Sequence, residues 1–221
     1  WPERRLRMVR YNPVATYEGI YERLVSGIER LKLAQYNLES YKRTGVERDE
    51  FEEGREEALV GIFKTRYLKR LESSIDAFRI SIRRALAFTK TFEEYVLGGR
   101  ILDSRSFAKA MQYLAREDEE DDLTPTSLAD DFDANEDAKT FLVNLQTLDT
   151  AQYDLRALHK ALQRDIDVLT DIWHLIKDIS PVEDDKLQAL KDLLAVRLQG
   201  QKVLIFTYYK DTARYLFREL G

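Results

Sequence analysis

The chain has 221 residues, of which 44% are hydrophobic and 34% charged, and its net charge is −5. It contains only nine glycines and four prolines, which argues against a turn-rich all-β fold, and no cysteine, which excludes disulfides, thiolate metal sites and cysteine nucleophiles. No apolar run approaches the roughly 20 residues that a membrane-spanning helix needs. The composition therefore favours a charge-rich, mainly helical protein.

Apolar residues at helical spacing predict three long helices before residue 100. The first runs from about Thr16, its predicted N-cap, to Tyr41. A polar connector that ends at Gly54 leads to the second helix, from about Arg55 to Leu71. The third keeps one apolar face from Ile75 to Val96 and is expected to stop at Gly98-Gly99.

The middle of the chain is strongly acidic. A short helix is predicted from about Ser104 to Ala115, and residues 117–137 then hold eleven acidic residues and no basic one, a net charge of −11. Like charges this close together repel one another and bury no apolar area. Residues 117–134 are therefore predicted to form a flexible linker.

A heptad pattern marks the longest predicted helix, from about Thr150 to Ile179, which follows a short helix from about Asn135 to Leu145. Apolar residues recur at every seventh position, and Asp165 is the one polar interruption of the companion seam. The pattern predicts coiled-coil-like packing against a partner helix, most simply the Thr16–Tyr41 helix. The recurring residues are Leu155, Leu162, Leu169 and Ile176.

The sequence changes character after residue 180. Ser180-Pro181-Val182-Glu183 combines a capping box with proline at the first helical position, and it predicts a helix that stops at Gly200. Lys202–Thr207 is a short apolar run with β-branched residues, typical of a buried strand in a parallel α/β sheet. A final helix begins near Asp211, and its predicted packing face consists of Ala213, Leu216, Phe217 and Leu220.

A lone strand cannot satisfy its own backbone N–H and C=O groups. No other segment of the sequence has a convincing strand pattern. We therefore expect residues 202–207 either to pair with another chain, as in a strand-mediated dimer, or not to form a strand. An isolated, ordered strand facing solvent would count against this interpretation.

Two parts of the sequence resemble a known family. Glu183–Lys191 and Gly200–Ala213 resemble the start of the second RecA-like lobe of Swi/Snf-type superfamily-two helicases, where a helix leads into the strand called helicase motif four. Tyr67–Arg79 resembles the region between the two lobes in bacterial members. Residues 1–60 and 100–180 look like helical insertions that decorate the second lobe. The resemblance implies a piece of an ATP-dependent DNA translocase or helicase, with ATP and Mg²⁺ bound elsewhere in the parent protein.

The departures from that family define what this chain itself can do. It has neither the Gly-x-x-x-x-Gly-Lys-Ser/Thr phosphate loop nor the Asp-Glu-x-His run that holds Mg²⁺, so we expect no cofactor, no catalytic residue and no ATP hydrolysis in the chain. The predicted fold class is mainly α, a helical bundle with long antiparallel helices plus one C-terminal β-strand and helix of a RecA-like α/β lobe. Its predicted parts are a helical region (1–116), the acidic linker (117–134), a long-helix hairpin (135–200) and the truncated start of the lobe (201–221).

The start of the chain carries no signal-peptide pattern and no methionine, since it begins at Trp1. We therefore expect a piece of a cytoplasmic protein, associated with the nucleoid if it is bacterial, with no membrane partner.

Basic residues gather on the second and third predicted helices. Between Lys64 and Lys90 there are eight basic and two acidic residues, a net charge of +6. Such stripes attract phosphate backbones, and by the resemblance the loop after the strand faces nucleic acid. The candidate nucleic-acid-binding residues are Lys64, Arg66, Lys69, Arg70, Arg79, Arg83, Arg84, Lys90, Thr207, Tyr208 and Lys210. The alternative is that the basic face pairs with acidic segments of the same chain, and residues 117–133 would then compete with nucleic acid.

Metal chemistry has little support. Asp171 and His174 are three residues apart, as two metal ligands on a helix can be, but a di-metal site needs a second such pair, so no metal site is predicted. An autonomous enzyme is disfavoured because no catalytic constellation is recognisable.

Two functions stay open. The first is an accessory and linking helical region of a Swi/Snf-type DNA motor, whose partners are DNA and the remaining helicase lobes. The second is a helical protein–protein interaction module without nucleic-acid binding.

Overall fold

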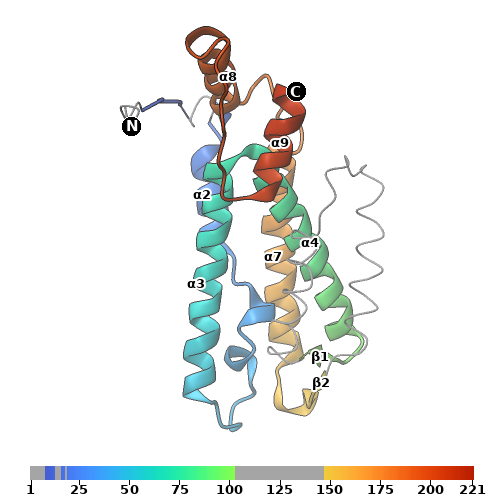
Figure 1. Ribbon diagram of the computed structural model, residues 1–221. Coiled ribbons are helices and arrows are strands. Elements are labelled where there is room, and N and C mark those ends of the chain that lie inside the picture. Colours follow the sequence, from blue (N-terminus) through green and yellow to red (C-terminus); the bar gives the residue numbers. More distant parts are fainter. Residues whose placement is uncertain (1–7, 13–15, 18, 103–146) are drawn as a thin grey trace.

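The computed structural model describes residues 8–12, 16–17, 19–102 and 147–221, and this part of the chain is mainly helical, which confirms the predicted helical class. The predicted helices at 104–115 and 135–145 and the acidic linker at 117–134 lie outside the described residues. The described helices are α2 (Tyr21–Arg30), α3 (Glu50–Ser73), α4 (Ile75–Leu97), α7 (Leu155–Ile176), α8 (Asp185–Asp192) and α9 (Lys210–Leu220) (Figure 1). Two short strands, β1 (Ile101–Leu102) and β2 (Thr147–Leu148), pair antiparallel.

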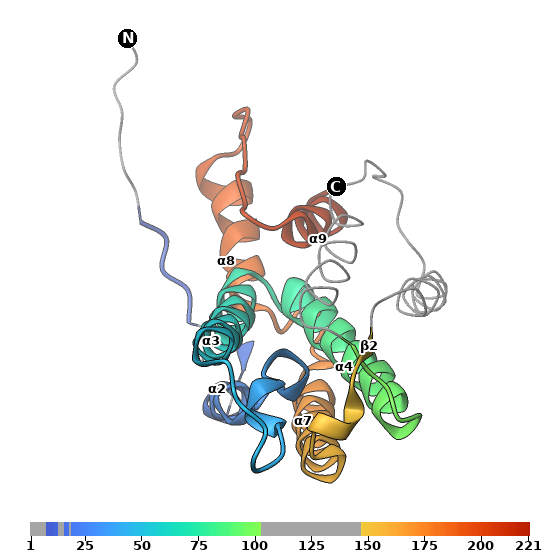
Figure 2. The ribbon, with the colours of Figure 1, turned by 90° about the horizontal axis from the view of Figure 1, so that it is seen from below.

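Helices α2, α3, α4 and α7, called the helical body below, pack around one apolar core (Figure 2). The heptad pattern correctly predicts the buried face of α7, where Leu158, Leu162 and Leu169 are inaccessible to solvent. The partner differs from the expected one, because α7 lies most extensively against α4 and makes a smaller contact with α2. That smaller contact is close, since a Cβ on Gly27 would come within 3.0 Å of Ile172.

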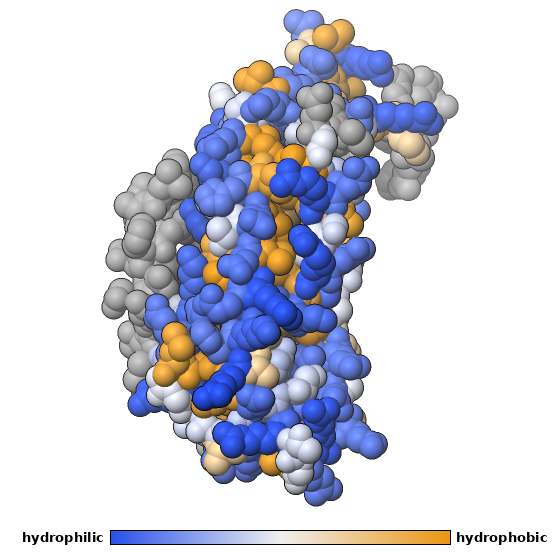
Figure 3. All heavy atoms as spheres, turned by 180° about the vertical axis from the view of Figure 1, so that it is seen from behind, coloured by the Kyte–Doolittle hydropathy of each residue, from blue (hydrophilic) through white to orange (hydrophobic). Residues whose placement is uncertain are grey.

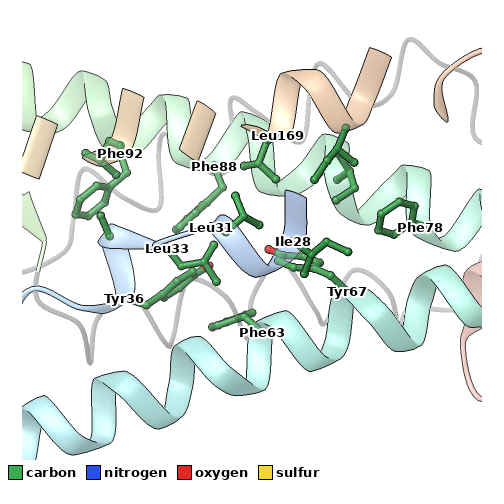
Figure 4. Close-up of a cluster of buried hydrophobic side chains, with 14 of the residues drawn as sticks. Ile28, Leu31, Leu33, Tyr36, Phe63, Tyr67, Phe78, Phe88, Phe92 and Leu169 are labelled. Atoms are coloured by element: carbon green, nitrogen blue, oxygen red, sulfur yellow. The ribbon is translucent and has the colours of Figure 1, made fainter. Parts of the chain in front are cut away.

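The predicted helix from Thr16 to Tyr41 is too long at both ends. Helix α2 begins at Tyr21, after Gly19 with φ of 70°, so Thr16 is not its N-cap, and it ends at Arg30. Leu33 adopts a left-handed backbone conformation with φ of 50°, and two 3₁₀ turns, Ala34–Tyr36 and Glu39–Tyr41, replace the helix. The break sends Leu31, Leu33 and Tyr36 into the core between α3 and α7 (Figure 4). Burial of these side chains compensates for the lost helical hydrogen bonds.

Helix α3 begins at Glu50, five residues before the predicted start, and Gly54 lies inside it rather than ending the connector. Asp49 is the reason, because its carboxylate accepts the backbone N–H groups of Phe51 and Glu52. Three glutamates in the first turn also face the positive end of the helix dipole. These effects together outweigh the roughly 1 kcal/mol that a glycine costs inside a helix.

A single residue, Ser74, closes α3 and opens α4. Its hydroxyl accepts the N–H of Ala77 at 3.1 Å, the hydrogen bond of an N-cap. At the other end of α4, Gly98 and Gly99 end the helix as predicted, with φ of 72° at Gly99.

The C-terminal part differs from expectation in three ways. Helix α8 begins at Asp185 rather than near Pro181 and ends at Asp192, followed by a π-helical turn at Leu193–Arg197. Residues 202–207, the predicted strand, run from that turn toward α9 without forming a strand (Figure 1). Helix α9 buries Asp211, Thr212 and Tyr215, whereas Ala213 and Phe217 of its predicted packing face are exposed.

The surroundings of residues 203–206, called the apolar segment below, explain why no strand forms there. Its exposed fractions are 40% for Val203, 84% for Leu204, 43% for Ile205 and 90% for Phe206. No backbone–backbone hydrogen bond joins this segment to any other described residue. A strand needs a neighbour to pair with, so local propensity alone does not produce one.

The surface is mostly hydrophilic on the face opposite that of Figure 1, with apolar patches between the charged side chains (Figure 3). Within the described ranges, no helix has the length and apolarity to cross a bilayer.

Candidate functional site

Several of the basic candidates on α3 and α4 make contacts inside the protein. The ammonium of Lys64 donates to the Glu29 carbonyl at 2.7 Å, in the last turn of α2. The guanidinium of Arg79 donates to the carbonyls of Ile176 and Ile179, the latter at 2.6 Å, at the end of α7. Cations at helix C-termini stabilise the negative end of the dipole, so these two residues have a clear role in holding the fold.

The remaining basic candidates differ in exposure. Lys69 and Lys90 are exposed, whereas Arg66, Arg83 and Arg84 are half-buried. Lys69 lies near the C-terminal end of α3 and Lys90 near the C-terminal end of α4. The basic candidates on the two helices are therefore divided between contacts inside the protein and exposed positions.

Arg70, which is also held inside the protein, brings two parts of the predicted site together. It is 4% exposed and forms an ion pair with Asp211, which is 3% exposed. Its guanidinium carbon also lies 4.7 Å from the centroid of the Tyr209 ring, a cation–π contact. The loop of residues 207–210 is thereby held against the end of α3, at the junction that we call the α3–α4 corner (Arg70–Ala77).

Further polar contacts surround this corner. The Thr212 hydroxyl lies 2.8 Å from that of Ser73 and 2.9 Å from that of Ser74. The ammonium of Lys186 donates to the carbonyls of Glu72 and Ser73, at 2.8 and 2.9 Å, and so caps the end of α3.

Helices α8 and α9 are joined to each other beside the corner. Tyr215 of α9 donates its hydroxyl to the Asp184 carboxylate at 2.9 Å, and the other oxygen of that carboxylate accepts the N–H of Leu187. Asp184 is therefore both the N-cap of α8 and the acceptor for α9. Burial, followed by the charge of Asp184, raises the pKa of Tyr215, so the phenol stays protonated and remains a donor.

A cavity of about 220 Å³ lies next to these contacts, lined among others by Tyr11, Tyr17, Tyr21, Asp184 and Lys186. The Tyr17 hydroxyl donates to the Leu71 carbonyl at 3.2 Å, and the Lys186 ammonium lies 5.2 Å from the centroid of the Tyr11 ring. Burial lowers the pKa of Lys186, although the negative charges of Asp184 and Glu72 act to raise it. The polar groups of this wall are largely used to join elements of the fold.

The loop before α9 presents aromatic surface to solvent. Tyr208 is 91% exposed and packs edge-on against Tyr209, with ring centroids 5.0 Å apart. Thr207 and Lys210 on either side are half-buried. This loop therefore combines one fixed aromatic ring, Tyr209 on Arg70, with one ring that is open to a ligand.

Metal ligands do not cluster in the part of the chain that the structure describes, where no group of three or more His, Cys, Asp or Glu residues could hold an ion. His159 lies 2.9 Å from the Glu93 carboxylate, across the contact between α7 and α4. Asp171 and His174 lie on the same helix, α7.

Sequence reasoning identified Arg70 and the 207–210 loop but missed Asp211, the partner of Arg70, and Asp184, the partner of Tyr215. Both aspartates stand beside the first turn of a helix, where an acid is expected for the dipole alone.

Comparisons of the chain with protein-family models, with curated proteins and with solved structures found no match.

Proposed function

We propose that this chain is a helical accessory and linking region of an ATP-driven nucleic-acid motor of the Swi/Snf type. In this proposal the apolar segment and α9 are the first strand and helix of a RecA-like lobe whose other strands are not among the described residues. ATP and Mg²⁺ would be bound by the rest of the motor. The observation that carries the proposal is the apolar segment itself, which exposes four large side chains immediately before a well-formed helix.

The exposure pattern is what a central parallel strand shows when its neighbours are absent. Alternate side chains of a strand point to opposite faces, and Leu204 and Phe206 are almost fully exposed while Val203 and Ile205 are about 40% exposed. Strands that are apolar on both faces belong to parallel sheets covered by helices on both sides. A sheet of that kind would cover all four side chains and would pair the free backbone groups.

The 207–210 loop supports nucleic-acid contact. In open α/β sheets, ligands bind beyond the carboxyl ends of the strands, and this loop follows the apolar segment directly. Tyr208 offers an exposed ring on which a base can stack, and Lys69 contributes an exposed cation next in sequence to Arg70. Stacking on an aromatic ring together with nearby positive charge is the usual way to bind single strands without sequence preference.

The test is fluorescence anisotropy of single-stranded DNA, titrated with the protein at about 50 mM and at about 200 mM salt. Tyr208→Ala is expected to weaken binding by roughly 5- to 100-fold, the usual value of one stacked base. Phe217→Ala is the matched control, because it removes another exposed ring, 72% accessible, from the same helix–loop unit. Lys69→Glu should weaken binding and reduce its salt dependence, whereas Lys160→Glu on the exposed side of α7 should not.

Arg79 is unsuitable for such a test, because its removal would take a cation from the end of α7 and weaken the fold. Equal binding by the Tyr208 and Phe217 variants would refute the proposed contact. If no DNA or RNA binds at about 50 mM salt, the observations favour the other function, a helical module that binds proteins through the exposed apolar segment.

A further inference from the structure

Helices α8 and α9 are attached to the helical body largely by polar contacts, whereas the helical body is built around an apolar core. Within the helical body most of the buried side chains are apolar, and Leu24, Ile28, Phe78, Ile82 and Phe92 are all inaccessible to solvent. Residues 184–221, all of which are described, contribute only two buried apolar side chains, Leu187 and Tyr215. They contribute three buried polar ones, Asp184, Asp211 and Thr212.

The contacts across this boundary are specific and short. Asp211 pairs with Arg70, Thr212 reaches the hydroxyls of both Ser73 and Ser74, and Lys186 caps α3. An exposed ion pair between Arg218 and Asp76, at 3.6 Å, lies beside them. All of them converge on the α3–α4 corner, and Figure 1 shows α8 and α9 at that end of the helical body.

A second set of contacts joins α8 to α9. Tyr215 donates to Asp184 at 2.9 Å, and Lys191 lies 3.8 Å from Glu219. The two helices are thus tied to each other as well as to the corner. A boundary with more buried polar than buried apolar side chains resembles an interface between domains, for which relative motion is the normal expectation.

We propose that residues 184–221 form a C-terminal unit that opens as a whole from the helical body, and that the buried Arg70–Asp211 pair is the latch that holds it closed. With the latch closed, the apolar segment is held between two anchored helices. Opening frees α8, the segment and α9 together. The inference goes beyond the proposed function, because it concerns this chain alone and does not require nucleic-acid binding.

The pair suits a latch because of its burial. Two charges that are 95% or more removed from water are held by each other, and removal of one leaves the other uncompensated in a low-dielectric site. The Asp211→Asn substitution keeps the shape of the side chain and removes only the charge. It therefore tests the latch with little change in packing.

The experiment is native-state hydrogen exchange of the whole chain, followed by mass spectrometry of peptides from α2, α7, α8 and α9. In Asp211→Asn, exchange of both α8 and α9 is expected to accelerate by about 100-fold or more, while α2 and α7 are unchanged. Acceleration of α8 is the decisive observation, because Asp211 does not contact α8. The matched control, Arg48→Gln, breaks an exposed ion pair with Glu53 at the opposite end of α3, where the arginine side chain is 48% exposed, and should leave all four peptides unchanged.

Acceleration of α9 alone would overturn the proposal, because it would mean that the end of the chain frays locally. Equal acceleration of all four helices, or of none, would overturn it as well. If the variant does not fold, exchange of the wild-type protein in increasing urea gives the same answer. The amides of α8 and α9 should then share one opening free energy that is smaller, and less dependent on urea, than that of α7. A single common value for all four helices would refute a separate unit.

Discussion

Asp165 is the residue whose replacement should tell most about how this fold is specified. It is 1% exposed, and its carboxylate accepts the N–H of Lys32 at 2.6 Å and of Ala34 at 3.1 Å. These are the donors left over where the backbone leaves the helical conformation after α2. We predict that Asp165→Ala destabilises the protein by about 3 kcal/mol, since a hydrogen bond to a charged group contributes roughly 1.5–3 kcal/mol and a buried N–H without an acceptor costs about 1–3 kcal/mol.

Asp165→Asn should be milder, at about 1 kcal/mol. The amide oxygen still accepts one N–H, and an uncharged group avoids the desolvation that raises the pKa of the Asp165 carboxyl. Urea unfolding at pH 7, followed by circular dichroism, gives the free energies. Asp167→Ala, an exposed position on the same helix, is the control and should change stability by no more than about 0.5 kcal/mol. The reasoning fails if the alanine and asparagine variants are equally unstable, or if the alanine variant is as stable as the wild type.

Two other predictions concern charge and association. Burial raises the pKa of the Glu56 carboxyl to about 7, so its folded state prefers the protonated form: its contribution to stability is full below pH 4.5 and is lost as the pH rises to about 7. The urea midpoint of the wild type should therefore fall relative to that of Glu56→Gln, which stays uncharged, as the pH rises from 4.5 to 7.5. A difference between the two midpoints that does not vary with pH would contradict this. The apolar segment should make the chain self-associate by pairing its backbone with that of a second copy. Leu204→Lys/Phe206→Lys should abolish this association in sedimentation velocity, whereas Phe217→Lys should not. A wild-type chain that stays monomeric at high concentration would argue against it.

The sequence predicts the parts of this fold that local rules determine. Helix α4 has a continuous apolar face, a serine N-cap and a pair of terminal glycines, and all three signals lie within its own residues. The inward face of α7 follows from the heptad pattern in the same way. These elements need no information from distant residues, which is why their existence and position are predicted well.

The break after Arg30 could not be predicted in this way. The residues from Leu31 to Leu38 have good helical spacing, and the reason that they are not helical is Asp165, far along the chain on α7. The heptad pattern marks Asp165 as a polar interruption of an apolar seam, but its hydrogen-bond partners cannot be inferred from residue spacing. A tertiary hydrogen bond overrides local propensity here.

The candidate site shows the same limit. The sequence makes Lys64, Arg70 and Arg79 candidates for nucleic-acid binding because a cation that caps another helix or pairs with a buried acid is indistinguishable, in sequence, from one that faces solvent. Their acceptors are backbone carbonyls and one carboxylate that lie on other elements. On α9 the error is the reverse, because Asp211 and Thr212 look like surface residues and are buried by their polar partners.

A single residue, Ser74, separates α3 from α4, so there is no flexible connector between the two helices. Because Ser74 ends one helix and begins the next, an insertion there would rotate every later side chain of α4 by about 100° about the helix axis. Phe78, Ile82 and Phe92 would then leave the interior together. The connector between Tyr41 and Asp49 can accommodate inserted residues. The Ser74 junction cannot, because it fixes the rotation of α4 about its own axis relative to α3.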